Sequence, residues 1–147
     1  MSKVDVNGIV GQVSRIREQA NLLIEQELSA RGLAGIMAAH GSVLHFLFQQ
    51  DRPVPIKAVV GAVGRVKSTV TGMLNTLESH GYVSKLPSEE DGRVIYVELT
   101  EKGSALRNDF EEVSRKLLEK VYGAMPQRDR ESLVKLLAQL DGNLRSP

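Results

Sequence analysis

The chain has 147 residues, of which 41% are hydrophobic and 25% are charged, a composition typical of one soluble globular domain or of two small lobes that share a core. The absence of cysteine excludes disulfides and thiolate chemistry, and the net charge of only +1 means that any affinity for nucleic acid must come from local placement of charge. No apolar run approaches about 18 residues, and the start MSKVDVNG lacks the layout of a signal peptide, so we expect a cytoplasmic protein that does not contact a membrane.

The first predicted elements are two helices. Apolar residues between positions 6 and 28 recur at steps of three and four, which places one apolar stripe on a long helix. The sequence RGLAG at 31–35 ends this helix, and a second helix is predicted over 36–50. The turn DRPVP follows, because a helix cannot continue through its two prolines.

Two further helices and a hairpin follow closely. A short helix over 56–63 should end at Gly64, a residue suited to a left-handed cap. The next helix, over 65–80, should end at Gly81. The segments YVSKLP and RVIYVELT flank the polar turn SEEDG, which predicts a two-stranded β-hairpin.

Two helices with apolar stripes complete the chain. Thr100 can cap the first of them, and Glu101 in its first turn is favoured by the helix dipole. Pro126 should open the last helix at its N1 position. The predicted fold is mainly α, an α+β winged helix of six helices with a two-stranded hairpin as its wing.

One face of the helix over 65–80 is apolar. Its residues recur at helical spacing, so we expect them to be buried. They are Val66, Val70, Met73, Leu74 and Leu77.

The other face of this helix is polar and basic. Short hydrogen-bonding side chains can approach base edges, and cations can neutralise phosphates. Serine and threonine are also ordinary first-turn residues, however, and an exposed polar face needs no partner, so this helix alone leaves DNA binding open. The candidate DNA-contacting residues are Arg65, Lys67, Ser68, Thr69, Thr71 and Asn75.

The hairpin adds a second candidate contact. Its tip, PSEEDGR, is acidic until Arg93. Asp91 could hold the Arg93 guanidinium by a charge-assisted hydrogen bond and direct it into a narrow minor groove. The alternative is an ordinary turn aspartate beside a solvated arginine.

These residues together carry a family resemblance. The stretch KSTVTGMLNTLESHGYV, the tip DGR and the segment VELTEKG, in this order and spacing, resemble the MarR family of bacterial transcriptional regulators over essentially the whole chain. The resemblance implies a dimeric winged helix whose wing arginine enters the minor groove of double-stranded DNA. By position, Lys67, Ser68, Thr69, Thr71 and Asn75 fall in the recognition helix, and Asp91 and Arg93 match the Asp-x-Arg of the wing.

The sequence departs from the family pattern at two positions. Val66 stands where the family often has a serine that caps the recognition helix, so water or a phosphate must replace that cap. Lys85 stands at the base of the wing where arginine is common. Because lysine lacks the bidentate geometry of arginine, we expect Lys85 to contact a phosphate rather than a base.

The terminal helices carry more apolar surface than one winged helix needs. They could form an intrachain bundle or an intertwined two-fold dimer, and the resemblance favours the dimer. We therefore expect dimerisation helices at 1–34 and 101–147 around a DNA-binding lobe at 35–100, and a pseudo-palindromic operator. The candidate dimerisation residues are Ile9, Val13, Ile16, Leu117, Val121, Leu133, Leu137 and Leu140.

The resemblance also implies a small-molecule effector, often an aromatic acid, between the dimerisation helices and the DNA-binding lobe. Arg17, His40 and His45 are candidates to line such a cleft. His40 and His45 point about 140° apart on an ideal helix, so they cannot hold one metal together. We expect no metal and no cofactor.

The remaining functional classes are less compatible with the sequence. An enzyme would need a nucleophile with a base, a phosphate loop or metal-ligand spacing, and none of these motifs occurs. A winged helix that binds proteins, such as an anti-repressor or a scaffold, should present an apolar or acidic face. We therefore predict a sequence-specific, ligand-responsive DNA-binding repressor that acts as a homodimer.

Overall fold

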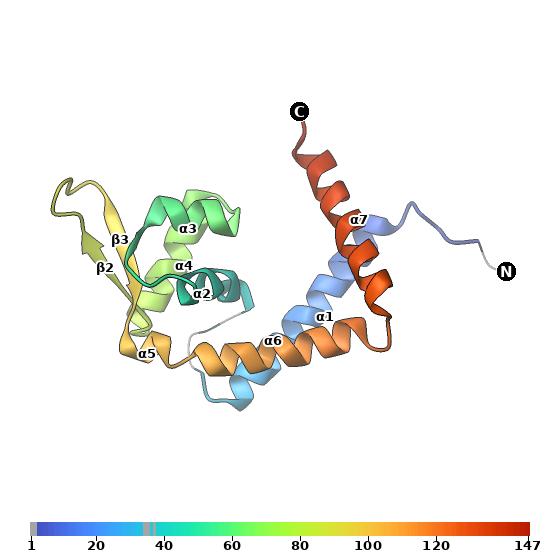
Figure 1. The fold of residues 1–147 in the computed structure, drawn as a ribbon, viewed down its shortest axis with the longest axis horizontal. Helices are drawn as coiled ribbons and strands as arrows, with labels where there is room; N and C mark the ends of the chain where they lie inside the picture. The colour runs from blue at the N-terminus through green and yellow to red at the C-terminus, as the bar shows by residue number, and fades with distance from the viewer. Residues whose placement is uncertain (1–2, 34–35, 37) are drawn as a thin grey trace.

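The computed structural model describes residues 3–33, 36 and 38–147, so the predicted domain boundary at 34–35 lies outside the described residues. Figure 1 shows a lobe around the hairpin, joined to a group of helices formed by the two ends of the chain. In chain order the elements are α1 (Ile9–Ala30), the 3-10 turn η1 (Ala38–His40), α2 (Gly41–Phe48), β1 (Val54–Pro55), α3 (Ile56–Val63), α4 (Lys67–Ser79), β2 (Val83–Pro87), β3 (Ile95–Leu99), α5 (Glu101–Ser104), α6 (Arg107–Tyr122) and α7 (Gln127–Arg145).

The sheet has one strand more than predicted. Its order is β1-β3-β2, and both pairings are antiparallel. The third strand, β1, is only two residues long and contains a proline, so the sequence indicated a turn there. Because Val54 of β1 and Lys85 of β2 both pair with the buried Val97 of β3, the wing is continuous with the core of the lobe.

Glycines end two helices as predicted. Gly64 ends α3 with φ 72°, and Gly81 follows α4 with φ 80°; these left-handed conformations favour a residue without a Cβ. Gly103 is needed for another reason. A Cβ at this position would lie 2.0 Å from the carbonyl oxygen of Tyr82, so the chain after the hairpin can pack closely against its start.

The last part of the chain differs from the prediction in two details. The helix expected after the hairpin is broken at Ala105 and Leu106 into the short α5 and the longer α6. Thr100 caps only α5, where its Oγ1 accepts a hydrogen bond of 3.1 Å from the Gly103 amide. Pro126 stands at the N-cap of α7 rather than at N1.

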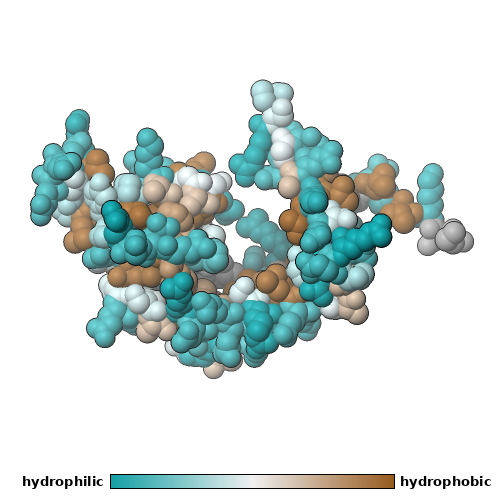
Figure 2. All heavy atoms as spheres, in the orientation of Figure 1, coloured by the Kyte–Doolittle hydropathy of each residue, from teal (hydrophilic) through white to brown (hydrophobic). Residues whose placement is uncertain are grey.

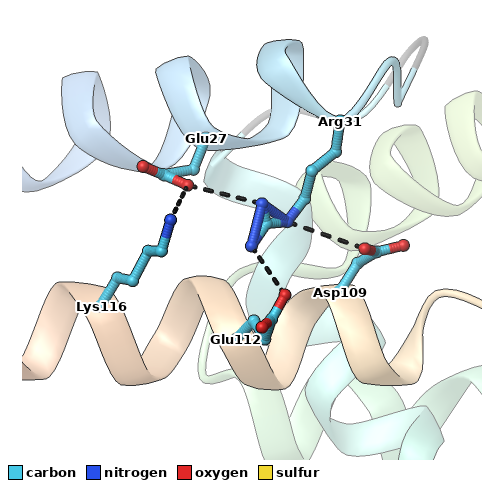
Figure 3. Close-up of polar contacts among 5 residues, drawn as sticks. All are labelled: Glu27, Arg31, Asp109, Glu112 and Lys116. Carbon is cyan, nitrogen blue, oxygen red and sulfur yellow. Dashed lines mark hydrogen bonds and ion pairs between the residues drawn. The ribbon is translucent and has the colours of Figure 1, made fainter.

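An ionic cluster joins α1 to α6 (Figure 3). Arg31, at the C-terminal cap of α1, lies 3.0 Å from a Glu112 carboxylate oxygen and 3.7 Å from one of Asp109. Its guanidinium also lies 3.5 Å from Glu27, which in turn is 3.2 Å from the Lys116 ammonium. The Arg31 side chain is only 17% exposed, whereas its partners Asp109 and Glu112 are 42% and 60% exposed. The cluster therefore links α1 to α6 through ion pairs that water partly screens.

The terminal helices leave a large apolar surface uncovered. No residue of α7 is buried, although Leu133, Leu137 and Leu140 recur along it at steps of four and three. Ile9, Val13 and Ile16 of α1 are also exposed. Figure 2 shows brown apolar atoms at the surface around these helices. A contiguous apolar surface of this kind is typical of an interface.

In the part of the chain that the structure describes, no helix is long and apolar enough to cross a membrane.

His40 gives the fold a predicted dependence on pH. It is 6% exposed in η1, and burial, with a smaller contribution from the charge of His80, lowers its pKa below the ordinary value of 6.5. The unfolded chain therefore binds the proton more readily than the folded one. We expect the free energy of unfolding to fall as the pH drops below about 6.5, by at most about 1.4 kcal/mol per pH unit from this group.

Urea unfolding at fixed protein concentration between pH 5 and 8 tests this expectation. The variant His40→Gln should show a flatter pH profile than the wild type. His45→Gln, which alters an exposed histidine of α2, is the matched control and should leave the profile unchanged. Parallel profiles for the wild type and His40→Gln would contradict the role assigned to His40.

Candidate nucleic-acid interface

The buried face of α4 fixes which side of the helix is presented. Val70, Leu74 and Leu77 have no exposed surface, and Met73 is buried with them. The opposite face is open to solvent: Lys67, Ser68 and Asn75 are exposed, and Thr69 and Thr71 are partly exposed. The predicted division of the helix into a core face and a polar face is therefore confirmed for these residues.

Val66 is the exception, and its predicted burial is wrong. The residue is 68% exposed at the N-cap of α4, where no side chain makes a capping hydrogen bond. Its backbone is extended, with φ −66° and ψ 151°. Val66 therefore belongs to the turn that begins at Gly64, the C-cap of α3, and not to the helix α4. Arg65, the neighbouring candidate residue in this corner, is also exposed.

At the wing tip Asp91 holds Arg93, which is one of the two arrangements that the sequence left open. Arg93 Nε donates to Asp91 Oδ1 at 3.1 Å, and Nη2 lies 3.4 Å from Oδ2. The backbone N–H of Arg93 also donates to Oδ1, at 3.0 Å. These hydrogen bonds favour the carboxylate and hold the pKa of Asp91 below its usual range. The Arg93 side chain is 92% exposed. Its backbone N–H and its guanidinium are nevertheless both bonded to Asp91, which restricts the direction of the side chain.

The tip itself is shaped by a serine. Ser88 Oγ accepts hydrogen bonds from the backbone N–H groups of Glu90 and Asp91, at 3.2 and 3.3 Å. The Ser88 amide donates to the Val94 carbonyl at 2.8 Å and closes the loop. The turn therefore places the Asp91 carboxylate beside Arg93 before any ligand arrives.

Lys85 lies between the wing and α4. Its ammonium donates a hydrogen bond to Asn75 Oδ1 and lies 3.6 Å from a Glu78 carboxylate oxygen. Two candidate DNA-contacting residues, Asn75 and Lys85, are thus bonded to each other. Sequence reasoning did not find this contact, because the partners are ten residues apart on different elements.

A cavity separates the terminal helices from the lobe. Its volume is about 650 Å³, and it lies between α1, α2 and α6. Of the candidate effector-binding residues, His45 lines this cavity, whereas Arg17 and His40 do not. The rings of Phe48 and Phe110, which are tilted by 57° with centroids 5.9 Å apart, were not predicted to lie there. The lining also includes Ile24, Gln49, Arg107, Glu111, Ser114 and Leu117.

The described residues contain no group of three or more histidine, aspartate or glutamate side chains that could hold a metal ion.

Residues 38–103 match the family of winged helix DNA-binding domains. This match and the geometry of α3, α4 and the β2–β3 wing show that this part of the chain is a winged-helix lobe similar to DNA-binding domains.

Solved structures extend the likeness to the whole chain. The chain is similar to MarR from E. coli, a mutant of which was solved in complex with operator DNA, at 21% identity and a TM-score of 0.77 over 93% of this chain and 99% of that one. It is similar to MepR of S. aureus, solved as a DNA complex, at 18% identity and a TM-score of 0.80 over 96% and 99%. BpsR of Bordetella bronchiseptica, whose DNA binding is regulated by 6-hydroxynicotinic acid, matches at 20% identity and a TM-score of 0.78 over 95% and 98%.

The chain therefore has the fold of MarR-type transcriptional regulators, and the resemblance seen in the sequence is confirmed for the fold.

Substitutions at Arg93 and Asp91 test whether the wing contacts DNA. We expect Arg93→Ala to weaken DNA binding by about 1–3 kcal/mol, the usual contribution of a defined groove contact. Asp91→Asn should weaken it less, because the guanidinium remains but is held less firmly. Both affinities are measured by fluorescence anisotropy at one salt concentration.

Arg115→Ala is the matched control. Arg115 is an exposed arginine of α6 that pairs with Glu119 at 2.8 Å, so its removal changes the net charge equally without touching the lobe. Equal affinities for the Arg93→Ala and Arg115→Ala proteins would contradict a groove contact by Arg93.

Proposed function

We propose that the protein is a homodimeric, sequence-specific repressor that binds double-stranded DNA and releases it in response to a small ligand. The observation that carries the proposal is the pairing of α4 with the wing. The apolar side of α4 is buried, its polar side is exposed, and Asp91 holds the exposed Arg93 at the wing tip. This activity is binding, with no catalytic step.

The two parts of the interface read different features of DNA. The exposed face of α4 fits the major groove, where short polar side chains reach base edges and cations reach phosphates. Arg93 on the wing fits the minor groove, whose negative potential attracts arginine. The proposed contacts are Arg65, Lys67, Ser68, Thr69, Thr71, Asn75, Lys85, Asp91 and Arg93.

A second copy of the chain is the proposed cover for the terminal helices. A helix of 19 residues with no buried side chain gains little packing energy from its own chain, and α-helices depend on such packing. Two-fold pairing through residues 1–34 and 101–147 would cover Ile9, Val13, Ile16, Leu117, Val121, Leu133, Leu137 and Leu140. The operator would then be pseudo-palindromic, with half-sites about one helical turn apart.

The cavity between the terminal helices and the lobe is the proposed effector site. Aromatic rings line one part of it, and Arg107 and His45 offer hydrogen-bond donors. This lining suits a small aromatic acid, the class to which the ligand of BpsR belongs. Arg17 and His40 do not line the cavity and are not part of the proposed site.

DNA binding is tested by titration with the promoter region upstream of the protein's own gene. We expect a complex whose affinity falls steeply with salt, since each neutralised phosphate contributes about −0.9 to the slope of log K against log salt concentration. A scrambled fragment of equal length is the control for sequence specificity. Absence of salt-dependent binding to any fragment would refute the proposal.

The dimer is tested with Leu137→Glu, which places a charge in the uncovered stripe of α7. We expect light scattering at micromolar concentration to give twice the chain mass of 16.1 kDa for the wild type. Leu137→Glu should give the chain mass itself, because a buried unpaired charge opposes association. Gln139→Glu, which adds the same charge on the other side of α7, should remain dimeric. A monomeric wild type would rule out the proposed pairing.

A further inference from the structure

The hydrogen bond between Lys85 and Asn75 determines which way the Asn75 amide points. An ammonium group can only donate hydrogen bonds, so it must face the amide oxygen of Asn75. The Asn75 NH₂ group is then left free on the exposed side of α4. If the amide turned by 180°, two donors would face each other, and the hydrogen bond would be lost.

Lys85 is itself held in place. Its ammonium lies 3.6 Å from the Glu78 carboxylate, one turn along α4 from Asn75, and the side chain is only 21% exposed. The backbone of Lys85 pairs with Val97 in the sheet, and α4 is fixed by the buried Leu74 and Leu77. The contact therefore joins two rigid elements, the recognition helix and the base of the wing.

We propose that Lys85 is a positioning residue that makes Asn75 a pure hydrogen-bond donor toward DNA. This inference rests on the proposed DNA-binding function. It also states which kind of base Asn75 prefers. Asn75 would select a base edge that offers only acceptors.

The rule follows from the pattern of the major groove. Guanine presents two acceptors, N7 and O6, whereas adenine presents the acceptor N7 beside the donor N6. A free asparagine can match adenine by donating from its NH₂ and accepting at its oxygen. The Lys85 ammonium takes one of the two lone pairs of the Asn75 oxygen and places a cation beside the other. The N6 donor of adenine would therefore meet a second donor at this position, so Asn75 loses the bidentate match and favours guanine.

The test compares binding sites selected from random DNA by the wild type, Asn75→Ala, Lys85→Met and Lys85→Arg. Asn75→Ala should lose base preference at one base pair in each half-site, which identifies the base that Asn75 contacts. At that base pair the wild type and Lys85→Arg should prefer guanine, because arginine is also a pure donor. Lys85→Met should shift the ratio of guanine to adenine affinities toward adenine by about fivefold or more, the lower range of a bidentate contact.

Lys57→Met is the matched control, because Lys57 is an exposed lysine of α3. It should leave the preference at this base pair unchanged. Circular dichroism confirms that each variant is folded. An unchanged preference in Lys85→Met, or adenine preferred by the wild type, would overturn the inference while DNA binding itself still stood.

A measurement without DNA tests the orientation directly. In ¹⁵N-labelled protein, the side-chain amide signals of Asn75 should move in Lys85→Met and stay in place in Lys57→Met. Unchanged signals in Lys85→Met would also overturn the inference. Failure of every fragment to bind would instead refute the proposed function together with this rule.

Discussion

The burial of one side of α4 is the constraint on which the interface depends. Full burial of a leucine or valine side chain is worth about 1.5–3 kcal/mol, and Val70, Leu74 and Leu77 are all fully buried. Rotation of the helix about its axis would expose them. The direction of Ser68 and Asn75 is therefore set by residues that never reach the surface, and the polar face can vary without loss of the fold.

The sheet also holds the wing in a fixed position relative to α4. β3 lies between β1 and β2, and its buried Val97 ties the hairpin to the core that holds α4. The close approach of Gly103 to Tyr82 fixes the point where the chain leaves the hairpin. Helix and wing are thus two parts of one rigid surface, with Lys85 bridging them at its centre.

Features set by near neighbours in the chain could be predicted from the sequence. The two faces of α4 follow from helical periodicity, and the contact between Asp91 and Arg93 spans two residues. Features set by tertiary packing could not. β1 is visible only through its pairing with β3, Lys85 meets Asn75 only because β2 packs on α4, and the exposure of Val66 depends on the turn at Gly64, which carries it out of the apolar stripe.

The absence of buried residues in α7 has a consequence for how the protein responds to its own abundance. In the proposed dimer, α7 packs mainly against the partner copy and is stabilised by mass action, so its order would depend on chain concentration. Folding of the termini, pairing of the chains and occupancy of the proposed two-part DNA site would then belong to one linked equilibrium. In that equilibrium, dilution would reduce DNA occupancy more steeply than a single binding step does.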